Sequence, residues 1–308
     1  MKKTTLTYLF LTGLLVVTSG IALTNGASHF SLLALSPTAQ NTLFNIRLPR
    51  ILAALLAGAT VAVSGALFQA ALRNPIADPG IMGVASGAHL FALLGGLVIP
   101  GLFFNRVLWA LAGGWLAFEL LVRFQPKMDP YRLILVGVAI NAMFSGFTAL
   151  IPTMPGQSSL SLATVTWTQT TLLAILGLGG LIIAVLLAPW GNYLKVSDAQ
   201  LVSLGQSPQR LRRGLLLTAV FLAATTTACV GVLAFIGIIV PHLGRQLVGR
   251  DYNRLLPFTM LAGGWLLLFF DTLGRLVIQP SELPATALLA IFGGPCLIWI
   301  LKGGTTHA

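Results

Sequence analysis

Three arginines stand at the ends of long apolar runs, where a charged side chain must find a partner or reach water. Arg47 and Arg50 flank Pro49, a residue that suits the first turn of a helix. Arg275 follows Asp271 by four residues, so both lie on one helical face and can form an ion pair. Because guanidinium groups recognise carboxylates, we expect the three arginines to dock acidic groups of an external partner. The alternatives are anchors that snorkel to lipid headgroups and the Asp271–Arg275 pair.

A second set of residues lies in the longest polar loop, residues 192–213. Asp198 suits the start of a short helix, Gly205 its end, and Pro208 the start of the next helix, while two leucines provide an apolar stripe. We expect the two short helices to pack against a soluble partner; packing against neighbouring loops is the alternative. The residues assigned to this contact are Asp198, Ala199, Leu201, Leu204, Gly205, Gln206, Ser207 and Pro208.

One apolar run, residues 131–151, has a polar face. Spacings of four, four and three residues place the following on one side of a helix: Gly137, Asn141, Ser145 and Thr148. Lipid disfavours such a face, so we expect it to line a path through the membrane, with Asn141 as its most polar group. The alternative is close helix packing through small residues.

The sequence contains no catalytic motif. It lacks a GxxxxGK[ST] phosphate loop, HExxH, GxSxG and paired Cys/His spacings, so we expect no catalytic residue, no metal site and no bound cofactor. A carrier coupled to ions usually needs a carboxylate or histidine deep in a span, and Glu119 lies only near the inner end of its span. We therefore expect the energy for any transport to come from a separate protein.

These residues must be positioned by a membrane-embedded scaffold. Hydrophobic residues make up 56% of the 308 and charged residues 8%, with a mean hydropathy of +0.91, which is too apolar for a water-soluble globule. We predict an all-α polytopic protein with one transmembrane domain over residues 1–308. At about 20 residues per crossing, the ten spans are expected near 6–23, 51–72, 81–99, 104–122, 131–151, 171–189, 214–231, 233–247, 256–274 and 284–301.

The basic residues predict which side each loop lies on. One basic cluster precedes residue 214 and another follows residue 244, so a single crossing between them would export one cluster, whereas two crossings keep both inside. With both termini cytoplasmic, 14 of the 18 Lys and Arg residues lie inside. The same rule explains the net charge of +11 without nucleic-acid binding.

A short internal match suggests an inverted repeat. Gly65-Ala66-Leu67 and Gly231-Val232-Leu233 each begin ten residues before a proline, Pro75 and Pro241 respectively. The spans that contain the two matches run in opposite directions. We therefore predict that spans two to five are repeated, inverted, in spans seven to ten, a design common in transporters.

The chain resembles the FecCD-type permeases, the membrane subunits of bacterial ABC importers for iron–siderophore complexes, haem and cobalamin. Five blocks carry the resemblance in the family's order: RLPR, GALFQAALRNPIADPGIMG, FIGIIVPHLGR, RLLPFTMLAGGWLLLFFDTLGR and ELPATALLAIFGGPCLIWIL. It implies a type II ABC importer permease with ten spans, paired with a second identical or homologous permease subunit. By position, Arg47, Arg50 and Arg275 match the family's arginines that meet a substrate-binding protein, and the SDAQLVSLGQSP loop matches the helices that seat on the ATPase.

The function implied by this resemblance is ATP-driven import across the bacterial cytoplasmic membrane. We expect a permease that passes ferric siderophores delivered by an extracytoplasmic binding protein, with two separate ATP-binding subunits that use ATP and Mg. A haem or cobalamin permease is the alternative within the family, and an ion-coupled secondary carrier is the alternative of another class.

Overall fold

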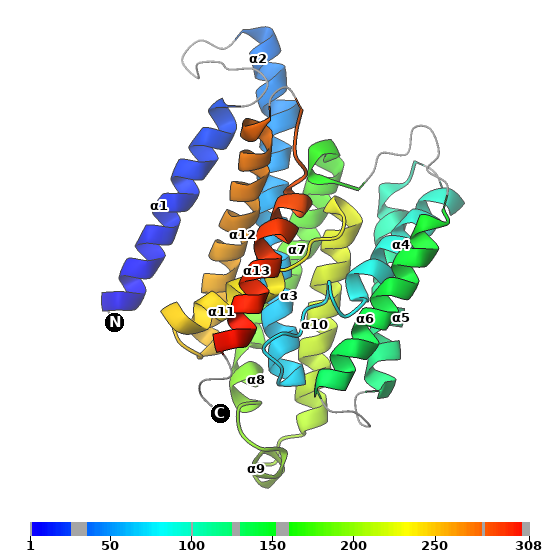
Figure 1. Cartoon of the computed structure of the whole chain (residues 1–308), viewed down its shortest axis with the longest axis vertical. Coiled ribbons are helices and arrows are strands. Elements are labelled where there is room, and N and C mark those ends of the chain that lie inside the picture. Colours follow the sequence, from blue (N-terminus) through cyan, green and yellow to red (C-terminus); the bar gives the residue numbers. More distant parts are fainter. Residues whose placement is uncertain are drawn as a thin grey trace.

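The computed structural model describes residues 2–25, 36–99, 101–124, 130–151, 160–278 and 281–303, and within these ranges the chain is helical without strands. Long helices lie side by side in one bundle, with short helices at its two ends (Figure 1). The helices are α1 (Lys2–Thr24), α2 (Pro37–Thr42), α3 (Leu48–Leu72), α4 (Val84–Val98), α5 (Phe103–Phe124), α6 (Pro130–Ala149), α7 (Trp167–Leu186), α8 (Ala188–Tyr193), α9 (Asp198–Ser203), α10 (Pro208–Val230), α11 (Ile236–Leu247), α12 (Tyr252–Val277) and α13 (Ala285–Gly303). A π-helical turn (Leu43–Arg47) joins α2 to α3, and a 3-10 turn (Leu162–Thr164) precedes α7.

A helix lies at each of the ten predicted spans. In the part of the chain that the structure describes, seven apolar helical segments are long enough to cross a membrane, namely α1, the continuous rod from Pro37 to Leu72, α5, α6, α7, α10 and α12, while α4 and α13 are shorter apolar helices. α11 differs from the prediction for 233–247. Its 12 residues extend about 18 Å, against about 30 Å for the hydrocarbon core of a bilayer. It is short because Gly231, at φ 85°, ends α10, and the chain becomes helical again only at Ile236.

We name the two ends of the bundle the α2 end and the α9 end (Figure 1). α10 begins at the α9 end, where Arg212 pairs with Asp198 at 2.8 Å. The chain returns to that end after α11, since Asn192 Nδ2 donates to Asp251 Oδ1 at 2.7 Å. Both basic clusters therefore lie at one end, as the charge pattern predicts. α1 begins and α13 ends toward this same end (Figure 1).

α3 and α10 form the centre of the bundle. In their membrane-length windows 83% and 78% of residues are buried, against 17% in α1 and 22% in α6. Glycines permit the closest helix approaches: a Cβ on Gly58 would clash with the backbone of Gly263 in α12, and one on Gly65 with the backbone of Gly237 in α11. The central helices thus pack backbone to backbone, while α1 and α6 leave wide apolar faces uncovered.

The helix contacts follow an inverted repeat. α3 packs against α11 and α12, and its counterpart α10 packs against α4 and α5, while α3 and α10 pack on each other. α4 and α11 both begin after a residue with left-handed backbone, Gly83 at φ 87° and Phe235 at φ 69°. The match that suggested the repeat is out of register, however, since Gly65 lies inside α3 and Gly231 follows the end of α10.

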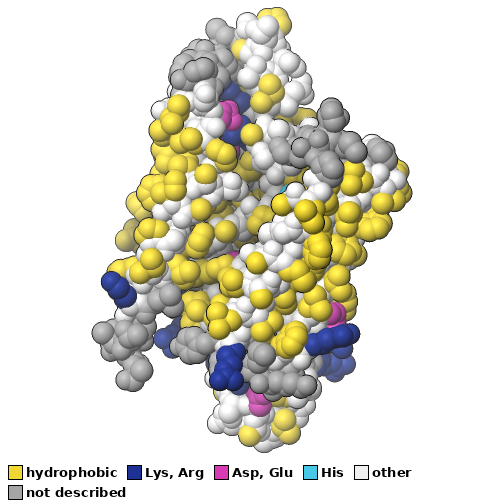
Figure 2. All heavy atoms as spheres, turned by 45° about the vertical axis from the view of Figure 1, so that its right-hand side comes forward, with side chains coloured by type: hydrophobic (Ala, Val, Ile, Leu, Met, Phe, Trp, Pro, Cys, Tyr) yellow, Lys and Arg dark blue, Asp and Glu magenta, His cyan; other side chains and the backbone are white. Residues whose placement is uncertain are grey.

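The surface is apolar around the middle and charged near the ends. On the face that Figure 2 shows, hydrophobic side chains are spread over the middle, and most of the Lys and Arg lie toward the α9 end. Large exposed apolar side chains occur on α6 and α13, the last helices of the two repeats: Leu135, Val138, Met143, Phe147, Ile291, Phe292, Ile298 and Trp299. This distribution suits a chain that spans a membrane and meets another apolar surface.

Candidate transport path and partner-binding sites

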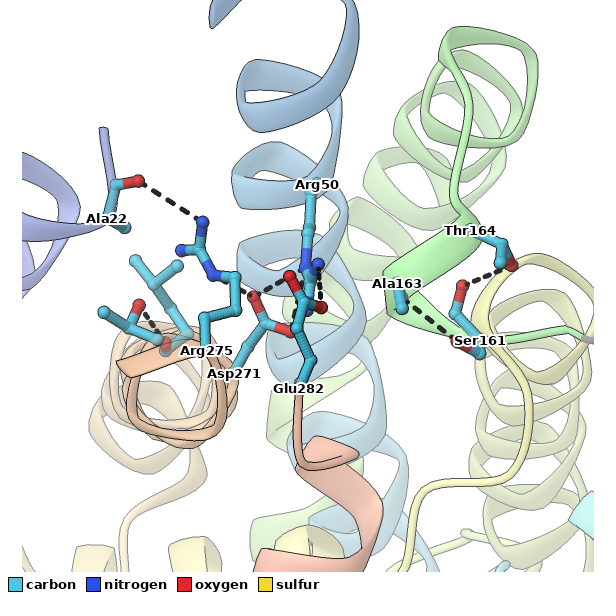
Figure 3. A network of polar contacts seen from close by, with 10 residues as sticks. Ala22, Arg50, Ser161, Ala163, Thr164, Asp271, Arg275 and Glu282 are labelled. Atoms are coloured by element: carbon cyan, nitrogen blue, oxygen red, sulfur yellow. Dashed lines mark hydrogen bonds and ion pairs between the residues drawn. The ribbon is translucent and has the colours of Figure 1, made fainter. Parts of the chain in front are cut away.

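At the α2 end, Arg50 lies within an ion-pair network rather than on the surface. Its guanidinium donates to both oxygens of Asp271 in α12, at 2.8 to 3.1 Å, and to Glu282 Oε2 at 2.8 Å. The side chains of Arg50 and Asp271 are 7% and 1% exposed, and that of Glu282 is 38% exposed. Figure 3 shows the three side chains converging from α3, α12 and the segment before α13.

Arg275 and Arg47 are also directed into the protein. Arg275 Nε lies 3.5 Å from Asp271 Oδ2, and its Nη1 donates to the carbonyl of Ala22 at 3.4 Å. Arg47 Nη1 donates to the carbonyl of Leu23 at 2.6 Å. The predicted i,i+4 pair is therefore present, and the three arginines expected to dock a partner are buried against acceptors of this chain. The reason is physical: at the edge of an apolar layer, a guanidinium is stable when carboxylate and carbonyl oxygens surround it.

A cavity of about 270 Å³ adjoins this network. Arg50, Asp271 and Glu282 form one of its walls, and residues 160–163 lie on another. We call it the charged cavity. Its remaining lining comes from α4, the α10–α11 connection and the start of α13: His89, Val230, Val232, Leu233, Leu283, Pro284, Ala285 and Thr286.

A second cavity, of about 340 Å³, lies against the polar face of α6, and we call it the α6 cavity. Three of the four residues predicted to line a path, Asn141, Ser145 and Thr148, line this cavity. Gly137 does not, because it packs against Met82, whose Cα would lie 2.9 Å from a Cβ at residue 137. At that position, close packing through a small residue is the correct interpretation. The other lining residues are Gly80, Ile81, Ser86, His89, Val232 and Ala234.

His89 and Val232 line both cavities, so the two spaces adjoin along α4 and the α10–α11 connection. Sequence reasoning missed His89 by considering only Glu119 as a deep ionisable group. The signal was available, because His89 lies between Ala88 and Leu90 within the apolar run that forms α4. An ionisable side chain inside such a run is a candidate for function.

The turn between α3 and α4 is inserted into the protein rather than lying at its surface. Arg73 ends α3 with left-handed backbone at φ 49°. Asp78 is fully buried, and its Oδ1 accepts hydrogen bonds from the amides of Gly80 at 2.7 Å and Ile81 at 3.2 Å. A Cβ on Gly80 would lie 3.1 Å from the carbonyl oxygen of Leu233. The turn thus reaches the α10–α11 connection and supplies part of the α6 cavity.

The loop 192–213 folds as its capping residues predict. Ser197 caps α9 and forms a reciprocal capping box with Gln200. After α9, Gly205 at φ 72° permits bonds from its own amide to Val202 O and from the amide of Gln206 to Leu201 O, both 2.9 Å. Ser207 caps α10 and Pro208 occupies its first turn.

Asp198 joins this loop to the rest of the α9 end. Its Oδ1 pairs with Arg73 at 2.9 Å and with Arg212 at 2.8 Å. Arg73 also donates to the carbonyls of Leu194 at 2.9 Å and Val196 at 2.5 Å. The turn after α3 and the start of α10 are therefore tied to α9 through one carboxylate.

The apolar surface of α9 differs from the predicted stripe. Leu201 is 1% exposed and belongs to the main core, whereas Val202 and Leu204 are 64% and 71% exposed. Ala199, like most of the loop, is exposed. Leu201 therefore anchors the helix in the core, while Val202 and Leu204 are left exposed.

A pair of side chains fixes the base of the loop. Asp251 caps α12 by accepting from the amide of Asn253 at 3.1 Å, and it also accepts from Asn192. The Asn192 hydrogen bond, followed by that from Asn253, lowers the pKa of the Asp251 carboxyl. Asn192 Oδ1 in turn accepts from the amide of Tyr252 at 3.0 Å. Movement of the loop base is therefore coupled to the start of α12.

A comparison with known protein families shows to which family this chain belongs. The model of the FecCD transport family matches residues 5–303. The chain belongs to the FecCD transport family. This FecCD permease is 41% identical over 312 residues to the probable heme-iron transport system permease protein IsdF of Staphylococcus aureus strains Newman and USA300, covering 97% of this chain and 96% of each relative.

A solved structure supports the same assignment. It is described as an inward-facing conformation of a metal-chelate type ABC transporter, and it matches with a TM-score of 0.82 and 30% identity over 96% of this chain and 98% of that one. The predicted type II ABC importer permease fold is therefore confirmed. As a FecCD permease for metal chelates, the chain is a multi-pass membrane component of an ABC importer whose ATPase is a separate subunit. This sets aside the ion-coupled carrier.

Proposed function

We propose that this FecCD permease imports haem-iron. The choice of haem-iron as the cargo rests on the 41% identity, over nearly the whole chain, to a relative named as a heme-iron permease. The adjoining charged and α6 cavities support it, because they combine apolar walls with a few polar groups and one imidazole. The ferric siderophore expected from sequence is the competing cargo.

We infer that the transport path closes between two permease subunits. In this chain the α6 cavity is bounded on one side by Asn141, Ser145 and Thr148, on a helix whose remaining surface is largely exposed. A second copy or a homologous chain against α6 and α13 would cover their apolar side chains and complete the path. The α2 end then faces the outside and the α9 end, with both termini, the cytoplasm of a bacterial cell.

We assign the contact with the ATPase to α9. Val202 and Leu204 protrude at the end where the positive-inside rule places the cytoplasm. Asp198 transmits movement of α9 to Arg73 and thus to the turn that lines the α6 cavity. ATP binding and hydrolysis in the partner can therefore reach the path through one ion pair.

We assign the binding-protein contact to the α2 end, around the network of Arg47, Arg50 and Arg275. Their guanidinium groups already have acceptors in the protein, so an acidic partner has to compete for them. Glu282 is the exposed carboxylate of the network and the group that such a partner would displace. Docking and opening of the charged cavity are then the same event.

The cargo is tested by uptake in bacteria that lack their own permeases of this family. Cells that express the chain with its ATPase and binding protein receive radiolabelled iron either as haem or as one of several ferric siderophores. Parallel cultures receive cobalamin labelled in its cobalt. We expect uptake from haem alone. Uptake confined to a siderophore or to cobalamin would reject the proposed cargo while leaving the importer assignment intact.

A further inference from the structure

We propose that His89 is a transient axial ligand for the iron of haem during its passage, an inference that rests on the haem cargo proposed above. The residue lies on α4 and lines both the charged cavity and the α6 cavity. Its side chain, with that of Val232, therefore lies on the boundary that the two cavities share. None of the roles described above for ion pairs, caps or core packing uses this imidazole.

The ring presents one edge to these spaces. Nδ1 is buried and has no hydrogen-bond partner among the described residues, while the residue as a whole is half-buried. The edge of the ring that carries Nε2 is therefore the part that the cavities can reach. Nε2 of a neutral imidazole is a common ligand of metals in proteins.

The chemistry of the cargo favours haem over a siderophore at this position. Haem iron is held in the plane of its macrocycle and takes up axial ligands such as histidine. A ferric siderophore that fills the coordination shell with its own oxygens offers no position to an imidazole. Among the described residues that line the α6 cavity, His89 is the only one with a side chain that ligates haem iron.

The surroundings of His89 favour weak rather than permanent ligation. Resident metal sites usually fix a histidine by a hydrogen bond from its second nitrogen to a carboxylate or carbonyl, which also raises its basicity. Nδ1 of His89 lacks such an acceptor among the described residues. A transport path needs this combination, because a contact strong enough to guide the cargo must still release it.

The test uses the complete transporter, with both permease subunits and the ATPase, in lipid nanodiscs, and ferric protoporphyrin IX as the probe. Wild type should give the absorption and electron paramagnetic resonance spectra of histidine-ligated haem. His89→Ala should lose them, and its apparent Kd for haem should rise on the order of tenfold. His89→Met, which offers a thioether, should give a third spectrum and serves if the alanine variant fails to assemble.

Two controls separate ligation from other effects. His242→Ala removes an imidazole that lies outside both cavities, and Ser86→Ala removes a polar group from the α6 cavity without removing an iron ligand. Both should keep the wild-type spectrum. Metal-free protoporphyrin IX has the shape of haem without its iron, so its binding should be the same in wild type and His89→Ala.

The outcomes are distinct. A wild-type spectrum in His89→Ala would overturn the ligand assignment, as would an equal loss of binding for metal-free porphyrin, which indicates a packing role. Haem uptake by the wild-type transporter tests the proposed function separately. If wild type carries haem and His89→Ala keeps its spectrum, only the assignment of His89 fails; if wild type carries no haem, both fail.

Discussion

Asp271 holds two arginines at a depth where little water can share the charge. Its side chain is 1% exposed, and those of Arg50 and Arg275 are 7% and 5% exposed. Each charge of this cluster is stable only because an opposite charge or a carbonyl faces it, and removal of one member leaves the others buried without compensation. The cluster thus ties α1, α3, α12 and the segment before α13 together.

Replacement of Asp271 by Asn should lower the free energy of unfolding by about 3 kcal/mol, because two buried guanidinium groups lose their shared carboxylate. The measurement is thermal unfolding of the purified chain in detergent. Glu282→Gln is the matched control, since Glu282 is 38% exposed and should cost about 1 kcal/mol or less. Equal losses of unfolding free energy in Asp271→Asn and Glu282→Gln would contradict this account of the cluster.

The sequence predicted only part of this network. Asp271 and Arg275 are four residues apart on one helix, so their pairing follows from helical periodicity alone. Arg50 meets Asp271 and Glu282 across separations of 221 and 232 residues, which no local pattern contains. The docking role expected for the arginines left these contacts out, because the partners of Arg50 come from distant elements.

α9 shows the same limit at the scale of an element. Its cap and its terminal glycine were predictable, because such residues act on the backbone beside them. The exposed face of α9 was not predictable in the same way. Leu201 and Leu204 would share one face only if the helix continued past Leu204. α9 ends at Ser203, and Leu204 is already the C-cap, with φ −86° and ψ 9°. Leu204 therefore leaves the face that buries Leu201.

Truncation of the two large apolar side chains exposed here, Val202→Ala in α9 with Leu204→Ala at its C-cap, should reduce transport and substrate-stimulated ATP turnover about tenfold or more, as loss of anchor residues does at interfaces. Stability should change little, because the truncated groups are exposed. Ser203→Ala, at the residue between them in the sequence, is the control and should keep transport. Normal coupling in the double variant would exclude this surface as the ATPase contact.

The contact between α3 and α11 depends on the absence of side chains. Gly65→Ala places a Cβ against the backbone of Gly237, which cannot move as a side-chain tip can. We expect a loss of about 1–3 kcal/mol in stability from this overpacking. Gly13→Ala in α1, where a Cβ meets nothing within 4 Å, should be neutral or slightly stabilising. The measurement is thermal unfolding of the two variants. Equal stability of Gly65→Ala and Gly13→Ala would show that α11 can shift away from α3 at no cost.

At the scale of the whole molecule, the inverted repeat places two unlike surfaces at the ends of the bundle and two adjoining cavities between its helices. The central helices α3 and α10 are buried, while α6 and α13, the last helices of the repeats, are exposed. Hydropathy predicted where the apolar helices lie, because it acts along the chain, although α11 is shorter than its predicted span. Which faces remain uncovered depends on packing between the repeats, and the cavities on both sides of His89 follow from that packing.

The proposed path between two subunits predicts a specific pattern of chemical access. In a chain whose cysteines, Cys229 and Cys296, are replaced by serine, Ser145→Cys and Thr148→Cys should react with a water-soluble thiol reagent, because they line the α6 cavity. Bound haem should slow both reactions by occupying that space. Ile182→Cys on α7 is the control, since Ile182 is 61% exposed in the isolated chain, yet a lipid-facing thiol excludes polar reagents. Rapid labelling of residue 182 with slow labelling of residues 145 and 148 would place the aqueous path beside α7 instead of α6, and would require a different pairing of the two subunits.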